Sequence, residues 1–290
     1  MQSYRLLTGS TADLPGSYYT EHELLVLPYP YTVGDQAYVD DPQQPCDMEA
    51  FYQSMRDGGM PTTSNVNQAA ILAAVQPVFE AGQDVVYITF TSGLTSTYQN
   101  AVMVQEYLKE THPDRTLYLV DSRCASIGQG VLVKQAVAWK EAGMPAQELC
   151  EKLDELKFRI HHFITVNDLD HLYRGGRISK TSATVGKLIS VKPILVINHE
   201  GQIVPYEKVN GRRKSIKRLF EKVRDLSVNI REQGVIHIVH GGCRKEAEKL
   251  AQMIREQLGV KHTAISYIGP VIGAHTGPDV LAVVFLGNPR

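Results

Sequence analysis

The sequence has few of the features that mark secreted, membrane-spanning or nucleic-acid-binding proteins. Only four of its 290 residues are cysteines, and they are too scattered for a CxxC pair or a zinc-binding pattern. We therefore expect free thiols and a cytoplasmic location. No apolar run approaches the roughly 18 residues of a membrane span, and no charged-then-apolar leader of a signal peptide is visible. The formal net charge of −1 gives no reason to expect nucleic acid or a membrane surface as a partner.

Motifs for nucleotide and metal chemistry are also missing. There is no dinucleotide-binding glycine motif after a strand, no P-loop, no HExxH pair and no GxSxG elbow. His161 and His162 are adjacent in an expected strand, so their rings should point to opposite faces and not share a metal. We expect neither a metal nor a cofactor. Serines and threonines near Asp13, Asp121 and His275 leave a Ser/Thr-nucleophile hydrolase or transferase open as an alternative.

What the sequence does contain is a cluster of hydroxyls after a buried strand. Residues 84–90 are nearly continuously β-branched or aromatic, which is typical of a strand inside a parallel sheet. A helix is expected to start near Thr95. Between them, the loop holds five hydroxyls in seven residues: Thr91, Ser92, Thr95, Ser96 and Thr97. A helix start offers unpaired N–H groups and a positive dipole end, which favour an anion. Ordinary N-capping is the alternative interpretation.

Similar hydroxyl clusters occur elsewhere in the chain. Residues 8–13 and 121–126 follow two further expected strands, and residues 62–65 precede an expected helix. Ligands of open parallel sheets bind beyond the carboxyl ends of the strands, so these loops are expected to share a site. Because the loops 62–65 and 91–97 contain no lysine or arginine, they favour a carboxylate over a phosphate.

The remaining pattern predicts an α/β fold of two domains, residues 1–160 and 161–290, the first with a mostly parallel sheet. A composition of 43% hydrophobic and 21% charged residues fits such a protein. The second half is expected to contain a strand at 159–166, a short helix at 181–189, a hairpin at 194–206 and a β–α–β unit at 234–267. Residues 268–278 are expected to form a glycine-rich loop.

Seven ordered sequence blocks resemble the motifs of the DegV family. They are STADLP (10–15), PTTS (61–64), TSGLTSTYQNA (91–101), DSRCASIGQG (121–130), RGGRISK (174–180), KPIL (192–195) and AHTGP (274–278). The resemblance covers essentially the whole chain. It implies a bacterial fatty-acid-binding protein of two α/β domains, with the acyl chain in a buried tunnel between or within them. It also implies a separate ATP-dependent kinase subunit, which phosphorylates the bound carboxylate for phospholipid synthesis.

The resemblance also implies site residues. Thr63 and Thr95 match the family's head-group hydroxyls, and both are expected at helix starts. The full set of expected ligand-binding residues is Thr63, Ser64, Thr91, Ser92 and Thr95. Arg177 and His275 match residues of the GGRIS and AHTG motifs. Both are expected in polar surface loops, where they would serve phosphoryl transfer to the bound carboxylate more than binding.

The chain departs from the family's pattern at several positions. Gly9 stands where the family often has aspartate before the first Ser-Thr pair. The usual LSGTY reads as residues 94–98, LTSTY, so that Ser96 replaces glycine, and the usual TSQPS reads as residues 63–67, TSNVN. The extra bulk of Ser96 beside the head-group site predicts that the preferred acyl chain or the kinase partner differs from that of other family members. A ligand-sensing interaction protein is a further alternative to the carrier.

Overall fold

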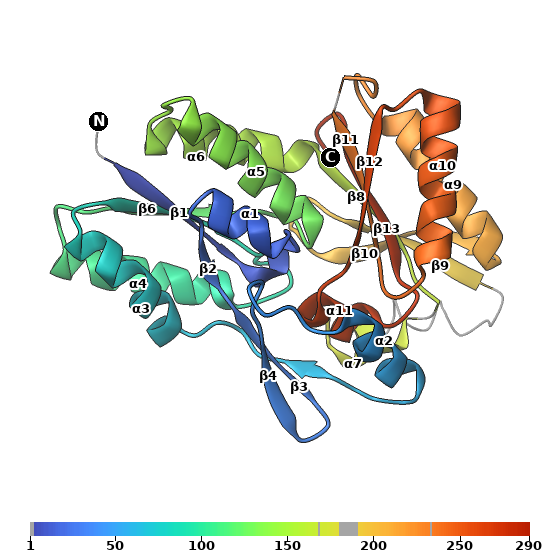
Figure 1. Ribbon diagram of the computed structural model, residues 1–290, viewed down its shortest axis with the longest axis horizontal. Coiled ribbons are helices and arrows are strands. Elements are labelled where there is room, and N and C mark those ends of the chain that lie inside the picture. Colours follow the sequence, from blue (N-terminus) through green and yellow to red (C-terminus); the bar gives the residue numbers. More distant parts are fainter. Residues whose placement is uncertain (1–2, 168, 180–190, 233) are drawn as a thin grey trace.

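The computed structural model describes residues 3–167, 169–179, 191–232 and 234–290. One sheet has four strands in the order β2-β1-β6-β7, and every neighbouring pair in it is parallel (Figure 1). Its strands are β1 (Tyr4–Gly9), β2 (Leu25–Leu27), β6 (Asp84–Thr89) and β7 (Leu117–Asp121). All six residues of β6 are buried, as the nearly continuous apolar sequence predicts for a strand covered on both faces.

Helices cover both faces of this sheet (Figure 1). One face carries α3 (Gln68–Glu80) and α4 (Thr97–Thr111); the other carries α1 (Gly16–Glu21), α5 (Ile127–Glu141) and α6 (Ala146–Leu156). No helix in the described part of the chain combines the length and apolarity needed to cross a bilayer.

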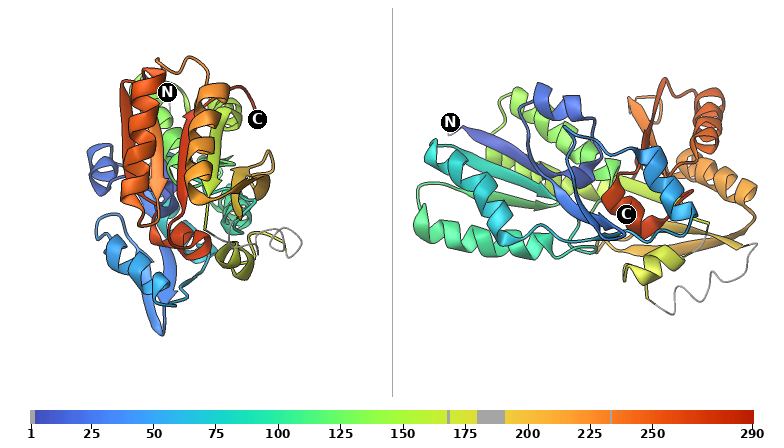
Figure 2. Two further views of the ribbon diagram at one scale, coloured as in Figure 1. Left: turned by 90° about the vertical axis from the view of Figure 1, so that its right-hand side faces the viewer. Right: turned by 60° about the horizontal axis from the view of Figure 1, so that its bottom comes forward.

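A second, mixed sheet is built from the other half of the chain. Its six strands follow the order β10-β9-β8-β13-β11-β12, with α9 (Arg212–Leu226) and α10 (Arg244–Leu258) packed on one face (Figures 1 and 2). The strands are β8 (Ile160–Thr165), β9 (Val191–Ile197), β10 (Ile203–Asn210), β11 (Val235–His240), β12 (His262–Tyr267) and β13 (Leu281–Leu286). The predicted hairpin is the antiparallel pair β9–β10, and the predicted β–α–β unit is β11, α10 and the parallel strand β12.

The two sheets divide along the sequence as a two-domain α/β fold requires. Every strand of the parallel sheet lies before residue 122, and every strand of the mixed sheet lies after residue 159. The boundary at residue 160, giving domains 1–160 and 161–290, stays a prediction. The predicted helix at 181–189 lies outside the described residues.

A small third sheet joins the two halves. Its antiparallel order is β4-β3-β5, and its hairpin projects from the molecule beside α2 (Figure 1). The bounds are β3 (Tyr29–Val33), β4 (Gln36–Asp40), β5 (Thr62–Thr63) and α2 (Met48–Arg56). Short helices complete the fold: η1 (Ser10–Ala12), η2 (Lys157–Arg159), α7 (Asp170–Arg174) and α11 (Pro270–Thr276).

Two local predictions are wrong. Residues 268–278 do not form a loop, because Pro270 begins the helix α11, whose apolar residues Val271, Ile272 and Ala274 are buried. Thr63 does not lie at a helix start: it belongs to β5, and α3 begins five residues later, capped by the Asn67 side chain. A short apolar stretch such as 268–278 is compatible with a loop or a helix, and paired hydroxyls are compatible with a helix start or a strand. Contacts with the rest of the chain decide between these alternatives.

A buried carboxyl group holds the loop after β1 against the second half of the chain. Asp13 accepts a hydrogen bond from the Ser126 hydroxyl, and its Oδ1 would lie 2.5 Å from a Cβ atom at Gly269, directly before α11. Burial, with a smaller contribution from Asp40, raises the pKa of Asp13 to about 8, although the Ser126 hydrogen bond opposes the shift. The folded protein therefore keeps a proton that the unfolded chain releases near pH 4.

Asp13→Asn is expected to make the protein more stable than the wild type at pH 8. Between about pH 4 and pH 8 the folded state binds one proton more than the unfolded state, so this carboxyl lowers the free energy of unfolding as pH rises, by at most about 1.4 kcal/mol per pH unit. Asparagine removes that dependence. Thermal unfolding from pH 5 to pH 8 measures it, with the exposed Asp35→Asn as the control. If the free energy of unfolding changes with pH to the same extent in the wild type and in Asp13→Asn, the expectation is contradicted.

Candidate functional site

A narrow cavity lies where the loops of the parallel sheet meet α7, β10 and α11. Polar side chains on its wall are Thr63, Ser64, Asn65, Thr95, Arg177, His275 and Thr276. Apolar or aromatic side chains on its wall are Tyr29, Phe90, Leu94, Leu172, Ile203, Val271 and Ile272. Both halves of the chain therefore contribute to one wall, with hydrogen-bonding groups beside a larger apolar surface.

Thr63 and His275 are joined across the cavity wall. The Thr63 hydroxyl lies 2.7 Å from His275 Nε2, which links β5 to α11 although the residues are far apart in sequence. The other ring nitrogen faces Gly175, where a Cβ atom would lie 2.2 Å from His275 Nδ1. Only glycine leaves room for the ring at that point, so Gly175, the first glycine of the RGGRIS motif, shapes the site because it has no side chain.

His275 is held in its neutral form. Burial, and to a smaller extent the charge of Arg177, lowers the pKa of His275 to about 4. The expectation that it lies in a surface loop is wrong, since it is a half-buried residue of α11. At pH 7 the ring therefore offers a hydrogen-bonding nitrogen and no charge.

Arg177 brings the positive charge of the site. Its Nε donates to the Leu94 carbonyl oxygen at 3.2 Å, and its Nη1 donates to the Gly175 carbonyl oxygen. The residue follows α7 in a loop, as the sequence predicts, and it is half-buried. Through Leu94, the guanidinium is tied to the loop that carries Thr95.

Thr95 begins a short chain of hydroxyls. Its Oγ1 lies 3.1 Å from Thr97 Oγ1 and accepts a hydrogen bond from the Thr97 backbone N–H at 3.3 Å, where α4 starts. The Thr97 hydroxyl in turn accepts a hydrogen bond from the Val66 N–H at 3.2 Å. Thr95 therefore lies within one turn of the helix start, as the sequence predicts.

The other three residues of the expected ligand-binding set lie in different surroundings. Ser64 is an exposed residue on the cavity wall. Ser92 lines a more open pocket beside the cavity, and its N–H donates to Asp121 Oδ1 at 3.1 Å. Thr91 is fully buried outside the cavity, and its hydroxyl donates to the Gly201 carbonyl oxygen at 2.9 Å. Thr91 thus ties the hydroxyl loop to the β9–β10 turn.

Of the three hydroxyl-rich strand ends, only the loop 91–97 contributes to the cavity wall, through Leu94 and Thr95. In the loop after β1, Ser10 Oγ accepts a hydrogen bond from the Tyr29 N–H at 3.2 Å. In the loop after β7, Ser122 Oγ accepts from the Cys124 N–H at 3.2 Å, and Ser126 is engaged by Asp13. These hydroxyls hold the loops in shape, and neither loop lines the cavity as the sequence led us to expect.

The charges on the cavity wall suit an anion with an apolar tail. Arg177 is the one formally charged residue on the described wall, which includes no carboxylate. The apolar wall residues were missed from the sequence because they follow ordinary core patterns. Tyr29 and Ile203, for example, are buried residues of β3 and β10, and no polar pattern in these strands marks them as part of a site.

Comparisons with known proteins agree over the whole chain. A family model described as "Uncharacterised protein, DegV family" matches residues 3–288. A DegV domain-containing protein from Clostridium perfringens is 40% identical over 290 residues, covering 100% of this chain and 99% of the relative.

Solved structures of similar proteins share the fold. A fatty acid binding DegV family protein from Streptococcus agalactiae superposes with a TM-score of 0.87 at 29% identity, covering 99% of this chain and 100% of the other. DegV from Bacillus subtilis, described as a fatty acid binding protein, has a TM-score of 0.84 at 26% identity with the same coverage. The α/β fold is therefore common to the group.

Proposed function

The chain belongs to the DegV family, and from that membership we propose that it binds a long-chain fatty acid in a buried tunnel between its two halves. The carboxylate accepts hydrogen bonds from the Thr63 and Thr95 hydroxyls, with Ser64 at the rim. The acyl chain lies along the apolar wall of the cavity. Similar proteins described as fatty acid binding support this choice of ligand.

One observation carries the proposal: a single cavity combines two unlike surfaces. Thr63, Thr95 and the neutral His275 present hydrogen-bonding groups beside the fixed charge of Arg177, while leucine, isoleucine, valine and aromatic side chains form the rest of the wall. Binding pockets typically pair an apolar lining with a few placed polar groups. A long-chain carboxylate has the same division between head and tail.

We propose that the chain is a cytoplasmic carrier without catalytic activity of its own. A separate kinase subunit phosphorylates the bound carboxylate with ATP, and the acyl phosphate feeds phospholipid synthesis. Arg177 and His275 lie beside Thr63 and Thr95, where phosphoryl transfer adds negative charge to an anionic head. A fixed cation at that position offsets the new charge.

Mass spectrometry of the protein purified under native conditions tests the carrier. We expect a non-covalently bound long-chain acid that is lost on denaturation, and no acyl phosphate after incubation of the chain with ATP and fatty acid alone. A covalent acyl adduct on a serine or threonine would overturn the proposal in favour of a hydrolase or transferase. Acyl phosphate formed without a partner would overturn the non-catalytic role.

A further inference from the structure

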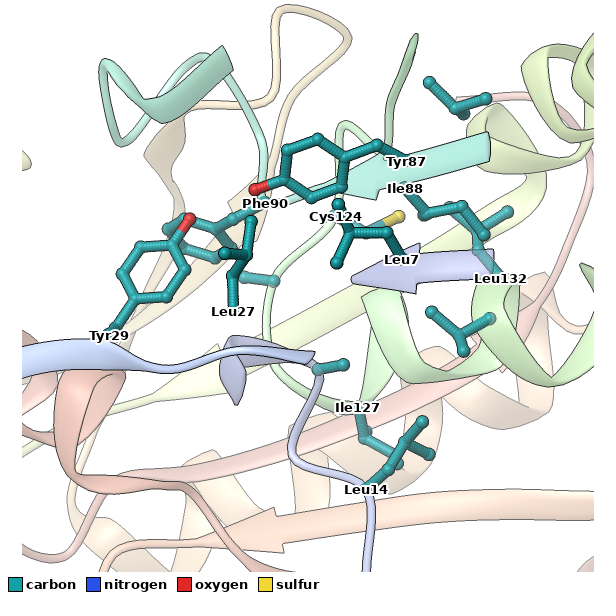
Figure 3. Close-up of a cluster of buried hydrophobic side chains, with 14 of the residues drawn as sticks. Leu7, Leu14, Leu27, Tyr29, Tyr87, Ile88, Phe90, Cys124, Ile127 and Leu132 are labelled. Carbon is teal, nitrogen blue, oxygen red and sulfur yellow. The ribbon is translucent and has the colours of Figure 1, made fainter. Parts of the chain in front are cut away.

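A surface groove lies between α2 and the hairpin of β3 and β4, which projects from the molecule beside that helix (Figure 1). Its volume is about 600 Å³, and none of its lining residues also lines the cavity. Tyr29, at the start of β3, lies in the interior beside Phe90 (Figure 3). Tyr31, two residues later in the same strand, lines the groove. The groove is therefore a second hollow, separate from the proposed fatty-acid site.

Aromatic rings form part of the groove wall. Tyr31 stacks on Tyr38 of β4 with the ring centroids 5.3 Å apart, and Phe51 of α2 meets the Tyr31 ring edge-on at 6.1 Å. Tyr38 is 41% exposed, although it is a large aromatic residue, so a ligand can reach its ring. The face of an aromatic ring carries partial negative charge and attracts a cation placed over it.

The charged residues of the groove are acidic. Asp41 and Asp47 line it, and the described lining includes no lysine or arginine. Arg56, at the end of α2, is engaged elsewhere, because its Nη2 lies 2.6 Å from Asp279 Oδ1 and donates to the Gly242 carbonyl oxygen. Residues 6–55 hold eight of the 31 aspartates and glutamates of the chain and none of its 30 lysines and arginines. The groove therefore lies in a segment with concentrated negative charge.

A cysteine on the groove wall responds to this charge. Cys46 is a free, half-buried thiol. Burial raises the pKa of Cys46, and the charges of Asp40 and Asp47 raise it further, although a hydrogen bond with Tyr31 opposes the shift. The same surroundings that disfavour a thiolate anion favour a cation.

We propose that this groove is a docking site for a partner protein, and that it binds an arginine side chain from an exposed segment of that partner. The planar guanidinium stacks on the exposed Tyr38 ring, and its N–H groups donate to the carboxylates of the groove. An acidic or purely apolar segment lacks this match in charge. Strand β3 pairs with β5, where Tyr31 is opposite Thr63, so a docked partner lies one strand away from the proposed head-group site.

An NMR titration of the full chain with ¹³C-labelled tyrosine rings tests the groove. The probes are a capped nonapeptide of alanine and serine with one central arginine, and the same peptide with citrulline, which keeps the shape of arginine without its charge. The arginine peptide should shift the ring signals of Tyr31 and Tyr38 to saturation and bind about ten-fold more tightly than the citrulline peptide. The buried Tyr4 ring should not shift. Added salt should weaken binding of the arginine peptide.

The double variant Asp41→Asn, Asp47→Asn should bind both peptides equally weakly. Asp47 caps α2 by accepting hydrogen bonds from the Glu49 and Ala50 N–H groups, and asparagine also caps helices, so the variant should fold. Asp57→Asn is the matched control, because it removes the same charge at the other end of α2, outside the groove.

Two results would overturn the docking site: equal affinity of the wild type for the two peptides, or no binding of either. Neither result would affect the fatty-acid carrier, because the groove and the cavity share no lining residue. For the same reason, the wild type and all groove variants should bind hexadecanoic acid equally well in a calorimetric titration.

Discussion

Replacing Thr95 with valine is expected to weaken fatty-acid binding at least ten-fold. Valine has nearly the shape of threonine, so the change removes the hydroxyl with little change in packing. A hydrogen bond to a charged group contributes about 1.5–3 kcal/mol, and about 1.4 kcal/mol corresponds to ten-fold in affinity. Calorimetric titration of delipidated protein with hexadecanoic acid measures the loss.

The controls separate binding from folding. Thr95 Oγ1 also accepts a hydrogen bond from the Thr97 N–H at the start of α4, so the valine variant should lose about 1 kcal/mol of stability. Thr111→Val, at the other end of the same helix, removes a hydroxyl that donates to the Tyr107 carbonyl oxygen, far from the cavity. Thr95→Ser should restore binding. Unchanged affinity in Thr95→Val would remove this residue from the site.

Replacing Arg177 with alanine is expected to lower acyl-phosphate formation about 100-fold while most of the fatty-acid affinity remains. Removing one preorganised group that stabilises developing negative charge typically costs 10²–10³ in rate. In the proposed transfer, the fixed charge of arginine is expected to counter the charge of the phosphoryl group. The measurement is acyl-phosphate production with ATP and the cognate kinase subunit, beside a titration of fatty acid with the chain alone.

Contacts in the cavity wall sharpen this prediction. Arg177 Nε donates to the Leu94 carbonyl oxygen, so the alanine variant also loosens the loop that holds Thr95. Arg177→Lys keeps a cation but loses the pair of hydrogen bonds to the Leu94 and Gly175 carbonyl oxygens. Its phosphoryl-transfer rate should therefore lie between those of Arg177→Ala and the wild type. Arg174→Ala removes an exposed cation three residues away and should change neither quantity. Equal losses of binding, transfer and melting temperature in Arg177→Ala would show that this residue only holds the fold.

His275→Ala should affect binding and transfer together. The ring is neutral because burial and Arg177 lower the pKa of His275 to about 4, so it adds no charge at neutral pH. We expect it to act through the 2.7 Å contact with Thr63, which positions one of the two proposed head-group hydroxyls. Because the ring stays neutral down to about pH 4, fatty-acid affinity from pH 6 to pH 8 should not report its titration.

The sequence by itself determined the fold class and the kind of site. Residues 84–90 are apolar at nearly every position, and only a strand covered on both faces tolerates this, so a parallel sheet with helices on each side followed. The change from apolar to hydroxyl-bearing side chains at Thr91 identified the end of this strand, just before the start of the next helix. The ordered motifs then predicted Thr63, Thr95, Arg177 and His275 as site residues, and all four line one cavity.

Only the tertiary structure decided which polar groups face the cavity. A hydroxyl is used by whichever partner lies nearest, and here that partner is often more than 100 residues away, as with Thr91 and the Gly201 carbonyl oxygen. The helix α11 likewise forms because its apolar residues are buried against other elements, which outweighs the glycines that suggested a loop. The neutral state of His275 depends on burial by chain segments far apart in sequence, and local sequence carries no record of such contacts.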